Sequence, residues 1–394
     1  MKRTFCFALF VALTIAFSVG ASAHWPEPGT NEVVTVAGTG SHGAWDGGLS
    51  QFNLPMAVIS DGQGGFIVAD TFNNLIRHIS GDGTVTTASG AITDIAADSF
   101  PAGSYIDGPM GEAGFWRPVS LALPFGGGLF IADSQNNAIR VITNGDVFTV
   151  AGGIGAGYAS GGPDEVMFDM PGAIAMHPDG YLYVADTSNH VIRRISPEGY
   201  TVTVAGQGGV PGYYNGPAEY ALFYGPMGLA ISPDGRIFVA DTGNHLIRVI
   251  EDGTVRTLAG TRNLVEAYPS GGMEDALYTL DGFENGWETY PIGGFTDGWP
   301  GMAMFYQPMG LALWGEYLIV ADSANHSIRV VSPQGEVRTL TGTGEPGFVF
   351  GATGIAAFHF PMGVYVYGDL LIIADTGNNM IRALNLIFTE VQYE

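Results

Sequence analysis

Aspartates and arginines at a fixed spacing are the residues of this chain that first suggest chemistry. Six copies of the pattern [VI]-A-D-[ST]-x-N-[NH]-x-I-R each place an Asp seven residues before an Arg. A catalytic site needs only one such pair, whereas a residue that recurs in every copy is expected to stabilise the structure of each copy. We therefore predict a structural role, in which each Asp accepts hydrogen bonds from the Thr/Ser-x-Asn turn and pairs with an Arg of its own or the next copy. Loss of one partner should cost about 3–5 kcal/mol. The predicted structural residues are Asp70, Asp133, Asp186, Asp241, Asp322 and Asp375, with Arg77, Arg140, Arg193, Arg248, Arg329 and Arg382.

The segments around these pairs predict β-strands. A Phe lies 17 or 18 residues before each Asp, and a Pro follows each Phe by three. The fourth copy contains the runs MGLAIS, RIFVAD, LIRVI and TVRTLAG, separated by turns that include 233–235 and 251–253. Apolar, β-branched runs bounded by Asp-Gly turns indicate antiparallel strands, and four strands in each copy make a propeller blade. The repeat predicts an all-β fold, a six-bladed β-propeller of four-stranded antiparallel blades. The blade cores should lie near 52–90, 115–152, 168–206, 223–260, 305–342 and 358–388.

The two ends of the repeat predict how the ring closes. The sixth copy supplies three convincing strands, and the missing fourth strand resembles VVTVAGTG at 33–40. We expect residues 33–38 to complete the last blade, because closure covers a sheet edge that would otherwise promote aggregation. A five-bladed ring with a spare copy is the alternative.

The repeat resembles the NHL-repeat family of six-bladed β-propellers over nearly the whole chain after residue 23. The resemblance is carried by the six D-[ST]-x-N-[NH]-x-I-R cores and by a lead-in with Asp-Gly at 46–47, 107–108 and 297–298 and Asn-Gly at 215–216. The lead-in departs from this pattern in the third copy (161–163) and in the sixth (351–352). Members of the family include protein-binding and RNA-binding modules, extracellular sensor domains and a zinc-dependent peptide lyase. The resemblance therefore implies a scaffold more than an activity.

Three histidines in consecutive copies, His190, His245 and His326, raise the possibility of a zinc site. Their turn should lie more than about 10 Å from the ring axis, given strands about 4.8 Å apart. Side chains at that radius do not converge on one ion with bonds of about 2 Å. We interpret them as repeat residues that alternate with Asn at the same position.

Variable residues near the axis are the better candidates for function. The two residues between each Phe and Pro differ from copy to copy and should surround the mouth of the central channel. Trp116, Arg117, Tyr224 and Gln307 are ligand-binding candidates, and Arg117 suits an anion. A metal is a further hypothesis, with Ca or Zn held by Asn53, Asp169 and His359, as in lactonase-type and lyase propellers. The alternative is that these residues only plug the channel.

One connection between copies is much longer than the others. Residues 261–304 form an insertion rich in carboxylates and aromatic residues. Long connections often carry binding sites, and aromatic rings beside carboxylates suit sugars, cationic peptides or a partner protein. Trp287, Tyr290 and Trp299 are the predicted anchors. A lid that buries its own aromatic residues is the alternative.

Composition limits the environment and the partners. A basic start, an apolar stretch and Ala21-Ser22-Ala23 predict a signal peptide at 1–23, which leaves the propeller at 24–394 in a secreted or periplasmic location. The only cysteine, Cys6, lies in that segment, so we expect no disulfide in the mature chain. The net charge of −24 disfavours nucleic acid and anionic membranes and favours cationic partners or divalent metals. No second apolar stretch predicts a membrane span.

These observations predict a secreted, non-catalytic binding scaffold for an extracellular protein, peptide or glycan. The alternative is a Ca- or Zn-dependent lyase or lactonase-type hydrolase that uses the central channel. The ligand, the presence of metal or catalysis, the oligomeric state and the choice between secretion and the periplasm stay open.

Overall fold

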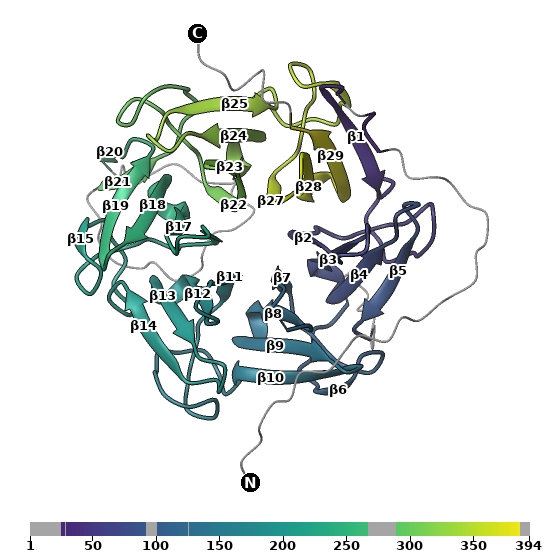
Figure 1. Ribbon diagram of the computed structural model, residues 1–394, viewed down its shortest axis with the longest axis horizontal. Coiled ribbons are helices and arrows are strands. Elements are labelled where there is room, and N and C mark those ends of the chain that lie inside the picture. The colour runs from purple at the N-terminus through teal and green to yellow at the C-terminus, as the bar shows by residue number, and fades with distance from the viewer. Residues whose placement is uncertain (1–24, 28, 92–100, 125, 267–288, 387–394) are drawn as a thin grey trace.

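The chain forms a ring of six β-sheets around a central axis (Figure 1). The computed structural model describes residues 25–27, 29–91, 101–124, 126–266 and 289–386. The sheets are antiparallel and are arranged as the blades of a propeller, so the predicted fold class is confirmed. The described part of the chain contains no helix with the length and apolarity needed to span a bilayer.

Each blade has its first strand nearest the axis and its fourth strand at the circumference. Blades one to three contain β2 (Ala57–Ser60), β3 (Phe66–Asp70), β4 (Leu75–Ile79) and β5 (Val85–Ser89); β7 (Pro118–Ala122), β8 (Leu129–Asp133), β9 (Ala138–Thr143) and β10 (Asp146–Gly152); and β11 (Pro171–Met176), β12 (Leu182–Asp186), β13 (Val191–Ile195) and β14 (Thr201–Ala205). Blades four to six contain β16 (Gly228–Ile231), β17 (Ile237–Asp241), β18 (Leu246–Glu251) and β19 (Thr254–Ala259); β22 (Pro308–Trp314), β23 (Tyr317–Asp322), β24 (Ser327–Val331) and β25 (Val337–Thr341); and β27 (Pro361–Tyr367), β28 (Leu370–Asp375), β29 (Met380–Asn385) and β1 (Glu32–Ala37).

The N-terminal strand closes the ring, as the sequence predicts. β1 pairs antiparallel with β29, with Val34 opposite Ala383. Figure 1 shows the two ends of the propeller side by side, with purple β1 against yellow β29. The spare strand therefore belongs to the sixth blade, and each of the six copies forms a blade.

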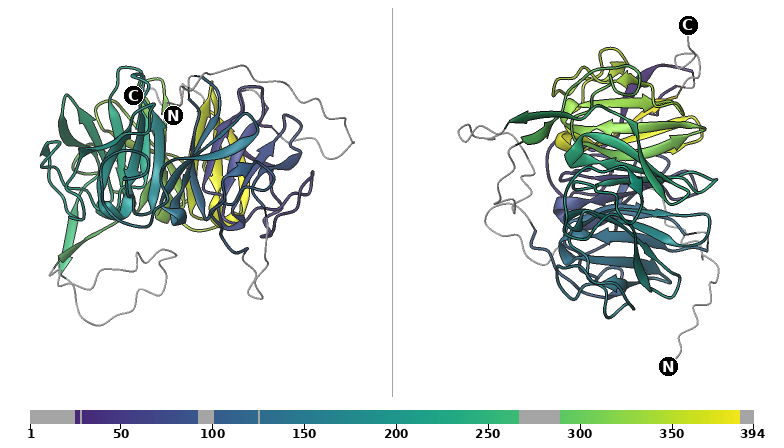
Figure 2. Two further views of the ribbon diagram at one scale, coloured as in Figure 1. Left: turned by 90° about the horizontal axis from the view of Figure 1, so that it is seen from below. Right: turned by 90° about the vertical axis from the view of Figure 1, so that its left-hand side faces the viewer.

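Two features of the sheets go beyond the four expected strands. Short fifth strands extend three blades at the circumference: β6 (Gly108–Pro109), β15 (Gly216–Pro217) and β26 (Gly351–Ala352). The two ends of the inserted connection, β20 (Asn263–Glu266) and β21 (Thr289–Ile292), pair with each other as an antiparallel hairpin. Figure 2 shows this hairpin projecting from one face of the ring.

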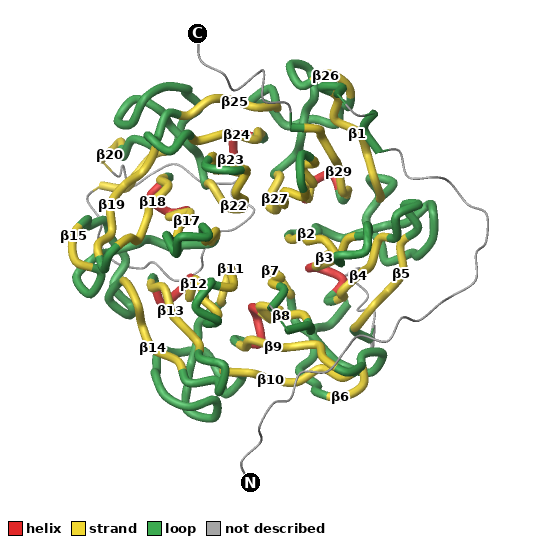
Figure 3. Tube along the Cα trace, in the orientation of Figure 1, coloured by secondary structure: helices red, strands yellow, loops and turns green. Residues whose placement is uncertain are grey.

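A 3₁₀ turn joins the second and third strands of every blade (Figure 3). The six turns are η1 (Thr71–Asn73), η2 (Ser134–Asn136), η3 (Thr187–Asn189), η4 (Thr242–Asn244), η5 (Ser323–Asn325) and η6 (Thr376–Asn378). The residue after each turn has a left-handed backbone, a conformation that Asn and His adopt more readily than most residues. This explains why only Asn or His occupies the position. We call the side of the ring that carries these turns the turn face.

The hydrophobic core lies between neighbouring blades. Ile319 and Ile328 of blade five pack in one cluster with Phe358 and Ile373 of blade six. The Phe before each first strand is fully buried in this way. The recurring Phe is thus a contact between copies, and it positions the residues that follow it next to the axis.

Candidate functional site

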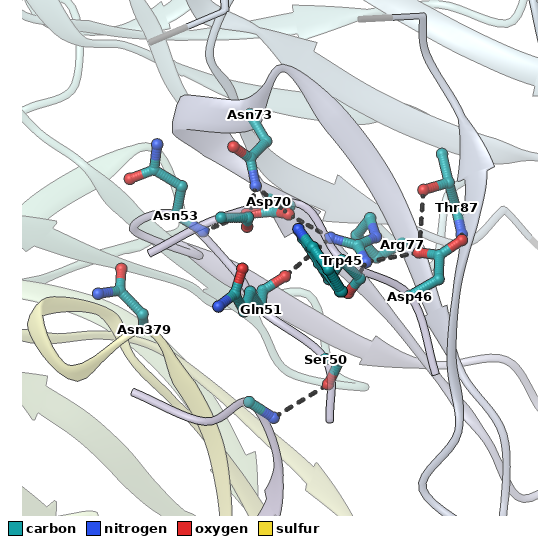
Figure 4. Close-up of polar contacts among 12 residues, drawn as sticks. Trp45, Asp46, Ser50, Gln51, Asn53, Asp70, Asn73, Arg77, Thr87 and Asn379 are labelled. Carbon is teal, nitrogen blue, oxygen red and sulfur yellow. Dashed lines mark hydrogen bonds and ion pairs between the residues drawn. The ribbon is translucent and has the colours of Figure 1, made fainter. Parts of the chain in front are cut away.

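The repeated Asp joins three parts of its own blade (Figure 4). In blade one, Asp70 Oδ1 accepts a hydrogen bond from the backbone N–H of Asn53 at 2.7 Å. Its Oδ2 accepts hydrogen bonds from Asn73 Nδ2 at 2.8 Å and Arg77 Nη1 at 2.7 Å. The predicted contact with the turn is therefore made by Asn73, and the Asp pairs with the Arg of its own copy in all six blades.

The Arg of this core also binds the lead-in segment. Arg77 Nη2 donates to Asp46 Oδ1 at 2.6 Å and to the Trp45 carbonyl at 3.0 Å. The equivalent partners are Asp107, Ser160, Asn215 and Asp297 in blades two to five. In the sixth blade Phe350 occupies that place in the sequence. The recurrent Asp-Gly of the lead-in was the signal for this second partner, which sequence reasoning did not assign.

Aromatic rings enclose the same Arg side chain. The guanidinium carbon of Arg248 lies 4.8 Å from the centre of the Tyr213 ring and 5.2 Å from that of Phe223. Cation–π contacts of this kind add stability when the cation is removed from water. Similar pairs of rings flank the Arg in blades two, three, five and six.

Electrostatics keep the Asp ionised at neutral pH despite its burial. Burial raises the pKa of Asp70 to about 6, while the charge of Arg77 and the hydrogen bonds from Asn53 and Asn73 oppose this rise. Both partners of the pair are fully buried. An internal ion pair with every oxygen occupied has no free atom for a substrate, so the structural role stays our prediction for all twelve residues.

The left-handed residue after each turn links one blade to the next. In blade one, Asn74 Oδ1 accepts a hydrogen bond from the backbone N–H of Arg117 at 2.8 Å. In blade three, His190 Nδ1 accepts the equivalent bond from Gly225 at 3.0 Å. We call each such bond an inter-blade joint. The three histidines are repeat residues, as predicted, and their role as acceptors explains why they alternate with Asn.

The residues directly after each Phe form what we call the inner ring: Asn53, Trp116, Asp169, Tyr224, Tyr306 and His359. Their backbone N–H groups all donate to the repeated Asp of their blade, so the core fixes their positions. Trp116 is 45% exposed and Tyr306 is 43% exposed, whereas Asn53 is buried. His359 lies against η6, because a Cβ at Gly377 would be 2.7 Å from its Cγ.

The second residue after each Phe adopts a left-handed backbone in every blade, including Arg117 and Gln307. Its N–H forms the inter-blade joint, as for Gln307, which donates to His245 Nδ1 at 3.1 Å. The predicted candidates Trp116, Arg117, Tyr224 and Gln307 thus all lie around the axis on the turn face. The structure brings them together as one zone, and all four come from the same two positions of the repeat in three different blades.

Methionines close the axis beneath the inner ring. Met56, Met309 and Met362 pack together and are buried, with Val119 and Met227 against them. These residues follow the repeated Pro in five different blades, so their contact places them at the axis. A ligand that approaches the turn face therefore meets the inner ring above a layer of thioether and aliphatic side chains.

The three proposed metal ligands come from separate parts of the ring. Asn53 belongs to blade one, Asp169 to blade three and His359 to blade six. Among the residues that the structure describes, no group of three or more His, Cys, Asp and Glu side chains is arranged to hold a metal ion. The hypothesis of a Ca or Zn site at these residues stays untested.

The anchors predicted in the insertion occupy different places. Trp287 lies outside the described residues, and so does the side chain of Tyr290, whose backbone pairs with Val265 in the hairpin. Trp299 is 55% exposed at the circumference of blade five, since the N–H of the preceding Gly298 donates to Val337 in the outermost strand. The hairpin itself lies beside η4 on the turn face, where the Pro291 carbonyl is a hydrogen-bond partner of His245.

Comparison with known proteins supports an NHL-type β-propeller. The model of the NHL repeat family matches residues 223–250, in blade four. NHL repeat-containing protein 2 from Bos taurus is 29% identical over 357 residues, which cover 81% of this chain and 44% of that protein. An auxiliary nutrient binding protein from Bacteroides thetaiotaomicron has a TM-score of 0.63 at 15% identity, over 90% of this chain and 76% of that one. A catalytically inactive virginiamycin B lyase from Staphylococcus aureus, with quinupristin, has a TM-score of 0.51 at 15% identity, over 90% of this chain and 99% of that one.

These similarities define the fold more closely than the function. The chain spans between 23% and 44% of the length of the first four curated relatives it matches. At 15% identity the two solved structures share the fold alone with this chain. One of them is described as binding and the other as a lyase, so the fold is compatible with either kind of activity.

Proposed function

We propose that this propeller is a non-catalytic binding scaffold whose ligand site is the inner ring on the turn face. The observation that carries the proposal is a contrast within each copy. The Phe, Asp, Asn and Arg of the core are the same in all six blades, whereas the residue they position at the inner ring differs in every blade except for Tyr224 and Tyr306. The framework is thus the same in every blade, while the residue at one position close to the axis varies. The six blades together therefore present an asymmetric surface to a ligand.

The chemistry of that surface supports recognition of a protein, peptide or glycan. Trp116 and Tyr306 are large, rigid aromatic side chains with nearly half of their surface exposed. Aromatic residues of this kind supply much contact area at a small cost in conformational entropy, and they are enriched at binding sites. The hairpin of β20 and β21 lies next to Tyr306, whose ring packs against Gly293 directly after the hairpin. The insertion therefore borders the proposed site.

We further propose that the protein works outside the cytoplasm, as a secreted or periplasmic protein released by cleavage near Ala23. The basic start and apolar stretch of residues 1–23 support this location. The absence of cysteine after Cys6 in the sequence is compatible with it, because the ion pairs and aromatic contacts of the core stabilise each blade without disulfides.

The experiment that tests the binding proposal removes the exposed aromatic surface. We expect a Trp116→Ala, Tyr306→Ala double variant to lose at least tenfold of the retention of its ligand from native extracellular medium, with an unchanged melting temperature. Leu49→Ala and Tyr200→Ala form the matched control, since both side chains are exposed elsewhere on the ring. Equal retention by the parent, the double variant and the control would contradict the proposal.

A second variant tests the contribution of the insertion. A short Gly-Ser link in place of 264–292 should leave the blade intact and weaken ligand retention. The cut must end before Gly294, because the Gly294 carbonyl accepts a hydrogen bond from Asn325 at 2.7 Å and Phe295 stacks on Arg329. Retention of every ligand by the shortened protein would assign the site to the inner ring alone.

The alternative of a metal-dependent lyase or lactonase-type hydrolase is distinguished by metal analysis. After extensive dialysis, a stoichiometric Ca or Zn whose removal by a chelator lowers the melting temperature would favour the enzyme. The binding proposal expects no such change. Asp169→Asn and His359→Gln would then identify whether the ion lies at the inner ring.

A further inference from the structure

We infer that the inner ring binds a short peptide with free ends, with Arg117 holding the terminal carboxylate and Asp169 holding the terminal ammonium group. This inference rests on the proposed binding function and names the class of ligand. It comes from two opposite charges that lie on neighbouring blades, both on the turn face and both without an ionic partner among the described residues.

Arg117 is a cation that the protein holds in place and leaves unneutralised. Its guanidinium carbon lies 4.5 Å from the centre of the Phe72 ring in blade one. In the described part of the chain its side chain has no hydrogen bond or ion pair, although nine of the other arginines form ion pairs with carboxylates. A guanidinium whose plane is fixed by stacking matches a carboxylate through two parallel hydrogen bonds.

Asp169 is the complementary group on the next blade. Its backbone N–H donates to Asp186 at 2.8 Å, which fixes the residue at the inner ring. Its carboxylate makes no hydrogen bond to any described residue, and burial alone raises its pKa above the ordinary value. An ammonium group placed beside this carboxylate would stabilise its charged form and offset the loss of hydrating water.

The two charges do not neutralise each other. The stacking of Arg117 on Phe72 directs the guanidinium toward blade one, whereas Asp169 belongs to blade three. No ion pair joins them within 4.0 Å. A ligand that satisfies both groups must therefore carry both an ammonium group and a carboxylate. A short peptide with free ends carries both groups, and two or three extended residues span about 7–10 Å.

The overall charge of the protein narrows the choice of ligand. With a net charge of −24, the chain repels a ligand that is only anionic. A ligand that is only cationic would leave Arg117 without a partner. A zwitterionic peptide has no net charge to be repelled, and each end meets a group of opposite sign.

Capped peptides test the inference directly. The full chain is immobilised and exposed at low salt to Ala-X-Ala tripeptide libraries with free ends, with an acetylated amino end, or with an amidated carboxyl end. We expect retention of the free library to exceed that of each capped library at least tenfold. Arg117→Gln should abolish the effect of amidation only, and Asp169→Asn should abolish the effect of acetylation only.

Matched controls and two outcomes make the test decisive. Arg256→Gln and Asp82→Asn change exposed charges away from the inner ring and should behave as the parent. Equal retention of the three libraries, or no retention of any, would overturn the inference. If the parent still retains a component of extracellular medium that the Trp116→Ala, Tyr306→Ala variant loses, the binding function stands and only the peptide assignment fails.

Discussion

The two halves of the ring are joined by different chemistry. Three consecutive joints use Asn: Asn379 to Leu54, Asn74 to Arg117 and Asn137 to Met170, at 2.9, 2.8 and 2.8 Å. The next three use His: His190 to Gly225, His245 to Gln307 and His326 to Phe360, at 3.0, 3.1 and 3.1 Å. Both side chains present an acceptor to the same backbone N–H, so the geometry of the joint is the same in the two halves. Only the histidines can take up a proton.

The difference matters because an imidazole loses its acceptor when it is protonated. Burial lowers the pKa of His190, His245 and His326 to about 4, and for His326 the nearby His359 adds to the effect. The folded state therefore favours neutral histidine. An unfolded chain takes up these protons near pH 6.5, so the His joints contribute fully above that pH and lose stability as the pH falls toward 4. The Asn joints have no such dependence.

The largest effect is expected from removal of the strand that closes the Asn half. Deletion of residues 24–38 removes β1 and exposes the edge of β29, so the variant should aggregate or fail to fold. Size-exclusion chromatography with light scattering provides the measurement. Replacement of residues 29–31 by Gly-Ser keeps β1 and serves as the control. A deleted protein that stays monomeric and melts like the parent would refute closure by β1.

Loss of a core Asp should be the next largest effect and should be equal in both halves. Asp133→Ala and Asp241→Ala each leave a buried Arg without its partner, which is expected to cost about 3–5 kcal/mol of unfolding free energy. Urea denaturation measures the change. Asp82→Asn, at an exposed position, is the control. A variant that unfolds normally and yet loses ligand binding would show that the pair is functional rather than structural.

Removal of single joints sharpens the comparison. Asn137→Ala and His190→Ala each leave a backbone N–H unpaired, with an expected cost of about 1–3 kcal/mol at pH 8. At pH 5 the cost of His190→Ala relative to the parent should shrink, because protonation of this histidine in the unfolded chain already lowers the stability of the parent, while that of Asn137→Ala should not. Denaturation at the two pH values checks this. An equal change for both variants would remove the distinction between the halves.

Conversion of the His half into Asn should give the smallest effect at neutral pH. A triple variant with His190→Asn, His245→Asn and His326→Asn should melt close to the parent at pH 8 and lose less stability between pH 6.5 and 4. The carboxylates of the core are the same in both proteins, so their contribution cancels in the comparison. Melting temperatures across this pH range provide the test, and parallel curves would contradict it.

The sequence by itself was enough for the architecture and for the structural role predicted for the repeated Asp and Arg. Their recurrence in six copies predicted that Asp70 forms an ion pair with an Arg of its own or the next copy, and the structure shows that its partner is Arg77 of the same copy. The closing strand was also predictable, because residues 33–38 resemble a strand that the last copy lacks. The ladder between Val34 and Ala383 confirms that assignment.

Only the tertiary structure decided the contacts between copies. The acceptor role of His190, the layer formed by Met56 and its equivalents, and the stacking of Arg117 on Phe72 all join residues of different blades. The spacing within a repeat says nothing about which side chains of two copies meet, because that depends on the angle between neighbouring blades and on the direction of each side chain. The same limit explains Trp299, which its place in a long connection made a predicted binding anchor. The neighbouring Gly298 pairs with the outermost strand of blade five and holds Trp299 at the circumference. Local order is set by the chain, whereas the surface that a ligand meets is set by how six similar sheets pack around one axis.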